Sequence, residues 1–173
     1  MKLLKVSILC LSLLFLVGSC SSEANNSKEF TVSTILTASG PLFEGSNTFQ
    51  AEISSNISDY IKENEIKEEE IVDITLKSAF ATLESYENLN LMQSISLQVF
   101  SDNFPMQNIA FANDMEDNMQ KVDLKVADLQ EELKSILFED KCYIIADGNI
   151  KEDIDDDLNL GMELVFSINY YKN

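Results

Sequence analysis

The chain has 173 residues, with 12 lysines, no arginine or histidine, and 30 acidic residues, which give a formal net charge of −18. An acidic surface repels phosphate backbones, so nucleic acid is excluded as an expected partner. The absence of histidine excludes Ser-His-Asp and Cys-His nucleophiles and imidazole-based zinc sites. No nucleophile-elbow, dinucleotide-binding or Ser-x-x-Lys motif is present either, so we predict neither enzymatic activity nor a cofactor.

The N-terminus has the layout of an export signal. Lys2 and Lys5 precede an apolar run at 6–17, and this run is too short for the ~20 residues of a membrane-spanning helix. Residues 16–20, Leu-Val-Gly-Ser-Cys, resemble the lipobox of bacterial lipoproteins. The resemblance implies that residues 1–19 are removed and that Cys20 carries a lipid that binds the protein to a membrane. Ser21 is not the retention signal of enterobacterial lipoproteins, so we expect an outer-membrane address. The alternative is an ordinary secretory signal, and the periplasmic or surface face stays open.

The chain from residue 20 onward is long enough for one domain. It contains 10 lysines and 30 acidic residues, a formal charge of −20. Residues 20–28 are polar and predict a flexible tether, and residues 29–173 predict the domain. Cys142 is the one other cysteine after residue 20, so no intramolecular disulfide is expected; a buried core cysteine and a reactive thiol are the two readings.

Alternation of apolar and polar residues predicts strands at 30–36, 70–81, 89–100, 108–112, 121–126, 141–146 and 158–170. The residues at 82–88 are predicted to form a hairpin connection, and Asp147-Gly148 a turn.

Two helices are predicted from spacing. Phe49, Ile53, Ile57 and Ile61 recur every four residues and indicate an amphipathic helix at 47–62, with an N-cap among Ser46–Thr48. A capping-box pattern at Asp128 and Glu131 predicts a second helix through Leu137.

These elements predict an antiparallel β-sandwich of about seven strands with two short helices. The runs beginning at Asp73 (Asp-Ile-Thr-Leu-Lys-Ser-Ala), Asn90 (Asn-Leu-Met-Gln-Ser-Ile-Ser-Leu) and Ile109 (Ile-Ala), followed by a long closing strand, resemble small Bacteroidota-type lipoproteins. That resemblance supports a β-sandwich and implies no activity.

One acidic cluster resembles part of a calcium loop. Asp153, Asp155, Asp157 and Asn159 follow the alternate-ligand spacing of an EF-hand, but Leu158 and Leu164 stand where its glycine and glutamate belong. A solvated hairpin tip is the favoured interpretation, and a looser calcium site is the alternative.

Together these observations predict a non-catalytic binding or interaction module at the cell envelope, with a possible envelope protein as partner. The alternatives are a carrier that holds an apolar ligand in an internal cavity, and a hydrolase that uses paired carboxylates.

Overall fold

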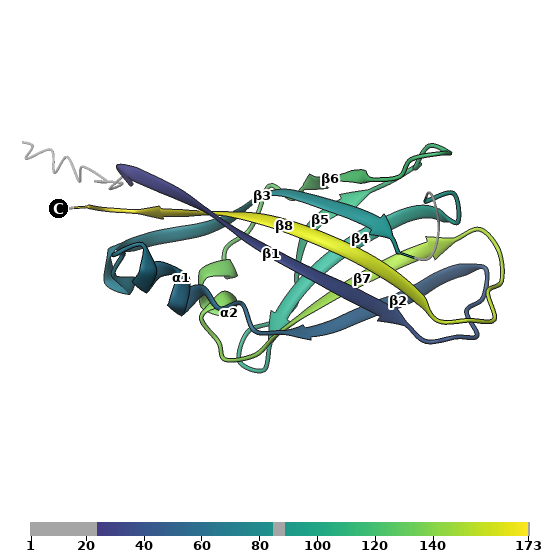
Figure 1. Ribbon diagram of the computed structural model, residues 1–173, viewed down its shortest axis with the longest axis horizontal. Coiled ribbons are helices and arrows are strands. Elements are labelled where there is room, and N and C mark those ends of the chain that lie inside the picture. The colour runs from purple at the N-terminus through teal and green to yellow at the C-terminus, as the bar shows by residue number, and fades with distance from the viewer. Residues whose placement is uncertain (1–23, 85–88, 173) are drawn as a thin grey trace, which may run out of the picture.

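The computed structural model describes residues 24–84 and 89–172, which form a closed antiparallel β-barrel (Figure 1). The described elements are, in chain order, β1 (Asn26–Ala38), β2 (Gly45–Ile53), α1 (Ile57–Glu63), a 3₁₀ turn (Glu68–Glu70), β3 (Ile71–Leu83), β4 (Met92–Ser101), β5 (Gln107–Ala112), β6 (Val122–Val126), α2 (Leu133–Leu137), β7 (Cys142–Ile150) and β8 (Leu158–Tyr170). None of the helices in these residues has the length and hydropathy of a membrane span.

The predicted β-sandwich is wrong, because the strands close into one barrel in the order β1-β2-β7-β4-β5-β6-β3-β8. Closure depends on β8, which pairs with β1 from Asn26↔Tyr170 to Ala38↔Leu158 and with β3 along its other edge. Strands with one apolar face suit both architectures, since a period-2 pattern does not encode which strand edges meet. The pairing also places residues 26–28, predicted as tether, in β1.

The barrel interior is filled by side chains at alternate positions of the strands. In β8, Leu164 and Phe166 are at most 1% exposed, and Phe49 of β2 and Leu97 of β4 are fully buried. An eight-stranded barrel has an interior that side chains can fill completely, and this barrel follows that rule.

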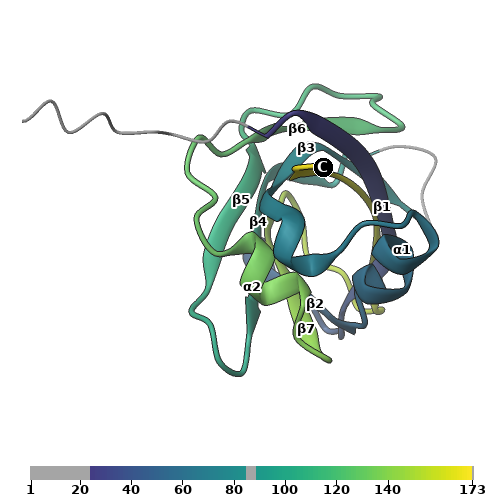
Figure 2. The same cartoon turned by 90° about the vertical axis from the view of Figure 1, so that its left-hand side faces the viewer.

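Both helices lie at one end of the barrel, near the start of β1 and the end of β8 (Figures 1 and 2). Their buried residues are Ile57 and Ile61 of α1 and Leu133, Ile136 and Leu137 of α2. These apolar side chains join the hydrophobic core, so the helices close that end of the barrel.

The predicted helix at 47–62 is wrong in its first part. Residues of β2 pair with β7 from Gly45↔Ile150 to Ile53↔Cys142, and α1 begins only at Ile57. A spacing of four residues keeps Phe49 and Ile53 on one face of a strand as well as on one face of a helix, so the pattern could not separate the two. The helix follows Asn56 in the left-handed conformation, with φ of 53°, instead of an N-cap among Ser46–Thr48.

Two further expectations were wrong. The predicted second helix is shorter, because the Gln130 side chain accepts the Leu76 N–H at 2.5 Å and donates to the Ala127 carbonyl at 2.9 Å, ahead of α2. Asp147 and Gly148 lie within β7 and form no turn. A Cβ at Gly148 would lie 2.8 Å from the Phe49 ring, so this glycine leaves room for core side chains.

The predicted strand at 158–170 is confirmed with the same bounds.

The pairing along the barrel is uneven. The β1–β8 and β2–β7 ladders run the whole length of their strands, whereas β5 and β6 share only the pairs Ala110↔Val126 and Phe111↔Lys125. The longest strands, β1, β3 and β8 with 13 residues each, lie side by side in one wall of the barrel, and this wall carries the site described next.

Candidate functional site

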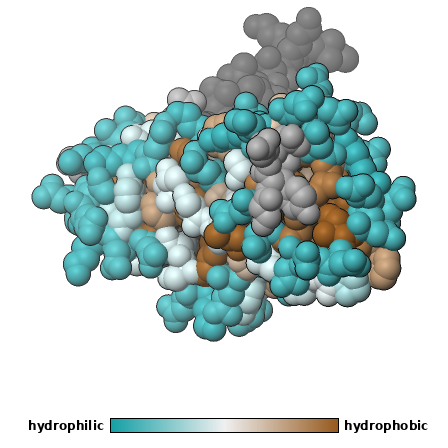
Figure 3. All heavy atoms as spheres, turned by 45° about the vertical axis from the view of Figure 1, so that its right-hand side comes forward, coloured by the Kyte–Doolittle hydropathy of each residue, from teal (hydrophilic) through white to brown (hydrophobic). Residues whose placement is uncertain are grey.

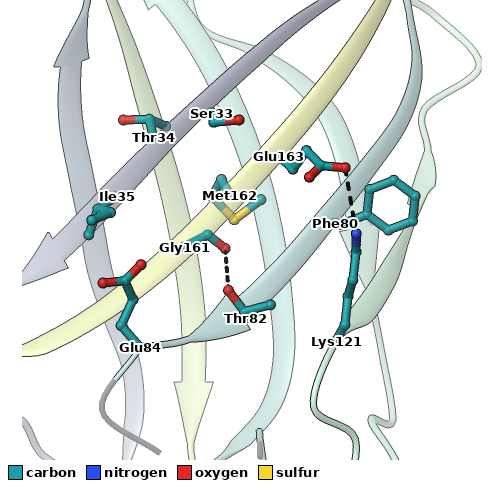
Figure 4. Close-up of a pocket in the computed structure, with 10 residues that line it drawn as sticks. All are labelled: Ser33, Thr34, Ile35, Phe80, Thr82, Glu84, Lys121, Gly161, Met162 and Glu163. Carbon is teal, nitrogen blue, oxygen red and sulfur yellow. Dashed lines mark hydrogen bonds and ion pairs between the residues drawn. The ribbon is translucent and has the colours of Figure 1, made fainter.

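A depression opens on the outer face of the wall formed by β1, β8 and β3 (Figure 4). Its volume is about 520 Å³. We call it the Gly161 depression, after the β8 residue at its floor. The residues that line it are Ser33, Thr34 and Ile35 of β1, Phe80 and Thr82 of β3, Glu84, Lys121, and Gly161, Met162 and Glu163 of β8.

At the floor of the depression, β8 carries no side chain at Gly161, and residues of β1 and β3 lie on either side of it. In the ladders, Gly161 pairs with Ile35 on one side and with Thr82 on the other, so all three face the same side of the wall. A Cβ at Gly161 would lie 2.7 Å from Thr82 Oγ1 and 3.4 Å from Glu84 Oε1. The space above the glycine is thus bounded by a hydroxyl and a carboxylate, and the Thr82 hydroxyl donates to the Gly161 carbonyl at 3.4 Å.

One half of the depression holds an ammonium group of the protein itself. Lys121 Nζ lies 3.5 Å from Glu163 Oε1 and 3.8 Å from the centroid of the Phe80 ring. The Lys121 and Glu163 side chains are 48% and 49% exposed. A cation is therefore bound there by a carboxylate and an aromatic face together.

The other half contains the exposed carboxylate of Glu84. The backbone N–H of Glu84 donates to the Asn159 carbonyl at 3.2 Å, which anchors the residue just beyond β3. Within residues 24–84 and 89–172, its carboxylate has no hydrogen-bond or ion-pair partner. Beside it, Ile35 is 48% exposed, so a free negative charge and an apolar side chain lie next to each other.

A second depression, of about 340 Å³, lies on the outer face of β2, β7 and β4. Its main feature is a stacked pair of rings, Phe100 and Tyr143, with centroids 4.9 Å apart. Glu52 also lines it and forms an ion pair with Lys141 at 2.6 Å. The hydrogen bond and charge of Glu52 raise the pKa of Lys141. This depression has no unpaired charged group like that of Glu84.

The face of the protein drawn in Figure 3 is mainly hydrophilic. Figure 3 shows hydrophobic residues in patches between polar and charged ones on the face it displays. The larger exposed hydrophobic residues are Ile35, Phe43, Val72, Met106 and Leu129, and they are distributed over different elements.

The predicted calcium candidates lie in the loop between β7 and β8 and do not converge on a metal site. Asp153 Oδ1 accepts the Glu44 N–H at 2.7 Å, and Asp157 Oδ1 accepts the Gly40 N–H at 2.8 Å. Asp155 lies near Gly40 through its backbone carbonyl. Among the described residues, no group of three or more acidic or cysteine side chains is arranged to hold a metal ion. The aspartates instead hold the β1–β2 loop against the β7–β8 loop.

The structure tests the prediction for only one of the two cysteines after residue 19. Cys20, the predicted lipidation site, lies outside the described residues, so its lipidation stays a prediction. Cys142 is fully buried in the core, which confirms the prediction of a core cysteine. Burial raises the pKa of its thiol to about 11, so the thiol stays protonated and unreactive at neutral pH.

Sequence reasoning missed Gly161, Glu84 and Lys121. A glycine inside an otherwise regular alternating strand is a signal for close approach or a missing side chain, and Gly161 fits that description. Glu84 and Lys121 had no such signal, because their positions beside Gly161 follow from the pairing of β3 with β8 and β6.

A scan of known protein families finds no family that matches this chain, and a search of the curated proteins finds no similar sequence.

Proposed function

We propose that the protein is a lipid-anchored, non-catalytic binding module of the bacterial outer membrane, which engages an envelope protein through the outer wall formed by β1, β8 and β3. The observation that carries this proposal is the Gly161 depression: it lies on the outside of the barrel, whereas the inside is filled by buried side chains. Anchoring comes from the lipobox-like residues 16–20.

The filled interior argues against the carrier alternative. A carrier requires an internal cavity with a mouth, but the side chains that point inward from β2, β4 and β8 include Phe49, Leu97 and Phe166, all at most 1% exposed. The described depressions are lined largely by outward-facing residues of the wall and of the loops. Apolar ligands would have to displace the core.

The arrangement of acids also argues against a hydrolase. Paired-carboxylate catalysis needs two acids in different environments, one of which is shielded from water. The two glutamates of the Gly161 depression are both exposed, and Glu163 is already neutralised by Lys121. Binding of a partner requires no such arrangement.

Site-specific photo-crosslinking in living cells tests the proposal. A photoreactive phenylalanine analogue replaces Ile35, 48% exposed at the depression, or Met106, 52% exposed between β4 and β5, as the matched control. We expect a discrete cross-linked envelope protein at Ile35 and none at Met106. Equal cross-linking at both positions, or none at Ile35, would contradict the proposal.

Two measurements check the other parts of the proposal. Cys20→Ala should release the protein from the membrane fraction, because the lipid would be lost. Organic extraction of the purified protein, followed by mass spectrometry, should find no stoichiometric non-covalent lipid. Retention of the Cys20→Ala variant on membranes would refute the anchor, and one bound lipid per chain would support the carrier instead.

A further inference from the structure

One half of the Gly161 depression already binds a cationic group, which belongs to the protein itself. The Lys121 ammonium occupies one half, held by the Glu163 carboxylate at 3.5 Å and by the Phe80 ring at 3.8 Å (Figure 4). An ammonium bound in this way keeps its charge near a carboxylate while its alkyl stem lies along apolar surface.

The other half also places a carboxylate beside apolar surface, with the aliphatic side chain of Ile35 in place of an aromatic ring. Glu84 Oε1 lies 3.4 Å from the position of a Cβ on Gly161, so its carboxylate stands directly over the floor of the depression. Ile35 supplies apolar surface on the opposite side of the floor, and Thr82 supplies a hydroxyl. In the part of the chain that the structure describes, no lysine pairs with Glu84.

We infer that this half of the depression, above Gly161 and between Ile35 and Glu84, receives a lysine or arginine side chain of the partner protein. The inference rests on the proposed function and names the chemistry by which the partner is recognised. The alkyl stem of the incoming residue lies against Ile35 at the edge of the floor, because an atom at the Cβ position of Gly161 would lie only 2.7 Å from Thr82 Oγ1. Its charged group pairs with the Glu84 carboxylate and lies close to the Thr82 hydroxyl.

Charge decides in favour of a cationic group. The chain carries a formal charge of −18, and −20 from residue 20 onward, so acidic partners are repelled over the Debye length while basic ones are attracted. A neutral group would gain no charge pairing with the Glu84 carboxylate. The depression is open and holds a single side chain, so the rest of the affinity comes from the partner's contacts with the surrounding wall.

The small number of glycines provides a direct test. The full sequence has five glycines, and four of them, Gly40, Gly45, Gly148 and Gly161, lie in the described residues. The lipidated protein, which by the proposal begins at Cys20 and keeps these four glycines, is labelled with ¹⁵N only at glycine and held in neutral detergent micelles, so that each glycine contributes one amide signal. Gly161 reports on the depression, whereas Gly40, Gly45 and Gly148 are internal controls.

The probe is Nα-acetyl-lysine N-methylamide, and the matched neutral probe is the same molecule acetylated on Nε, both added at constant ionic strength. We expect the lysine probe to shift the Gly161 signal saturably in the millimolar range, with the three control signals unchanged. The neutral probe should not shift the Gly161 signal. Nor should N-acetylglucosamine, an uncharged sugar that serves as a control for non-specific binding. A shift of Gly161 by the neutral probe or by the sugar equal to that by lysine would overturn the inference, as would the absence of any shift.

Glu84→Gln should lower the affinity for the lysine probe about three-fold or more, because the amide keeps the shape of the side chain and removes its charge. Glu68→Gln, an exposed glutamate in the 3₁₀ turn, is the matched control and should not change the affinity. Unchanged affinity in Glu84→Gln would refute the role of that carboxylate.

The two proposals fail separately. A partner that cross-links at Ile35, together with no response of Gly161 to lysine, would leave the proposed function standing and reject the cation site. Saturable lysine binding without any cross-link at Ile35 would support the cation site and reject the proposed engagement of an envelope protein.

Discussion

The two faces of β8 differ in almost every property. Inward, the strand presents Leu160, Leu164 and Phe166 to the core, each at most 1% exposed; outward, it presents Gly161 and Glu163 to solvent beside β1 and β3. The inner face determines whether the barrel folds, since burial of large apolar side chains dominates folding free energy. The outer face contributes little to stability, so its residues are available for recognition.

Truncation of the core should be the most damaging change. Phe166→Ala removes a ring that is 1% exposed and leaves a cavity, so we expect the free energy of unfolding to fall by about 3–5 kcal/mol. Val165→Ala, the neighbour on the outer face, should cost less than about 1 kcal/mol. Denaturant unfolding followed by circular dichroism measures both, and similar losses would break the distinction between the two faces.

The buried thiol of Cys142 should make the protein less stable in alkali. The pKa of the thiol rises from its ordinary value near 9 to about 11 on folding, because burial disfavours the thiolate. Its contribution to stability is therefore complete below pH 9 and is lost as the pH rises toward 11, because the unfolded chain releases the proton first. The loss should reach about 1 kcal/mol at pH 10.

Unfolding of the wild type and of Cys142→Ala, measured from pH 8 to pH 10.5, isolates this effect. The variant should show a flatter dependence on pH, whatever its stability at pH 8. Identical slopes would contradict a thiol that is held protonated in the core.

Asp157→Ala should destabilise the barrel by about 1 kcal/mol, because the Gly40 N–H loses its acceptor at 2.8 Å. Asp156→Ala is the matched control, since no hydrogen bond or ion pair of its side chain is found within the described residues. Thermal unfolding compares the two. Equal effects would mean that the loss of negative charge in this loop, and not the specific hydrogen bond, controls its stability.

The Lys121–Glu163 pair should matter least for stability. Both side chains are half exposed, so a double-mutant cycle with Lys121→Gln and Glu163→Gln should give a coupling free energy below about 0.5 kcal/mol. A coupling above about 1 kcal/mol would show that this part of the outer face also supports the fold.

The sequence was most reliable where one side of a strand is strictly apolar. The strand at 158–170 was predicted with its observed bounds, and the strands predicted at 108–112 and 121–126 end at the same residues as β5 and β6. The strand predicted at 141–146 overlaps β7, which begins one residue later and continues four residues further, to Ile150. It was least reliable at Phe49 and Ile53, whose spacing suits a helix and a strand equally. The buried state of Cys142 also followed from its apolar neighbours.

The candidate site could not be predicted in the same way. Gly161 carries a recognisable local signal, but Glu84 and Lys121 are ordinary exposed charges in sequence. They share a depression with Gly161 only because β3 pairs with both β6 and β8. The acidic residues that do stand out in sequence, Asp153 and Asp157, are used to hold two loops together.

Residue types and local period alone establish the absence of histidine-based chemistry, the acidic charge, the alternation of most strands and the burial of Cys142. Tertiary structure decided the rest. Closure into a barrel depends on pairing between β1 and β8, which begin 132 residues apart at Asn26 and Leu158, and no local pattern encodes that pairing. The same pairing places Ile35 beside Gly161, and the β3 ladder adds Glu84, so the site exists only once the barrel has closed.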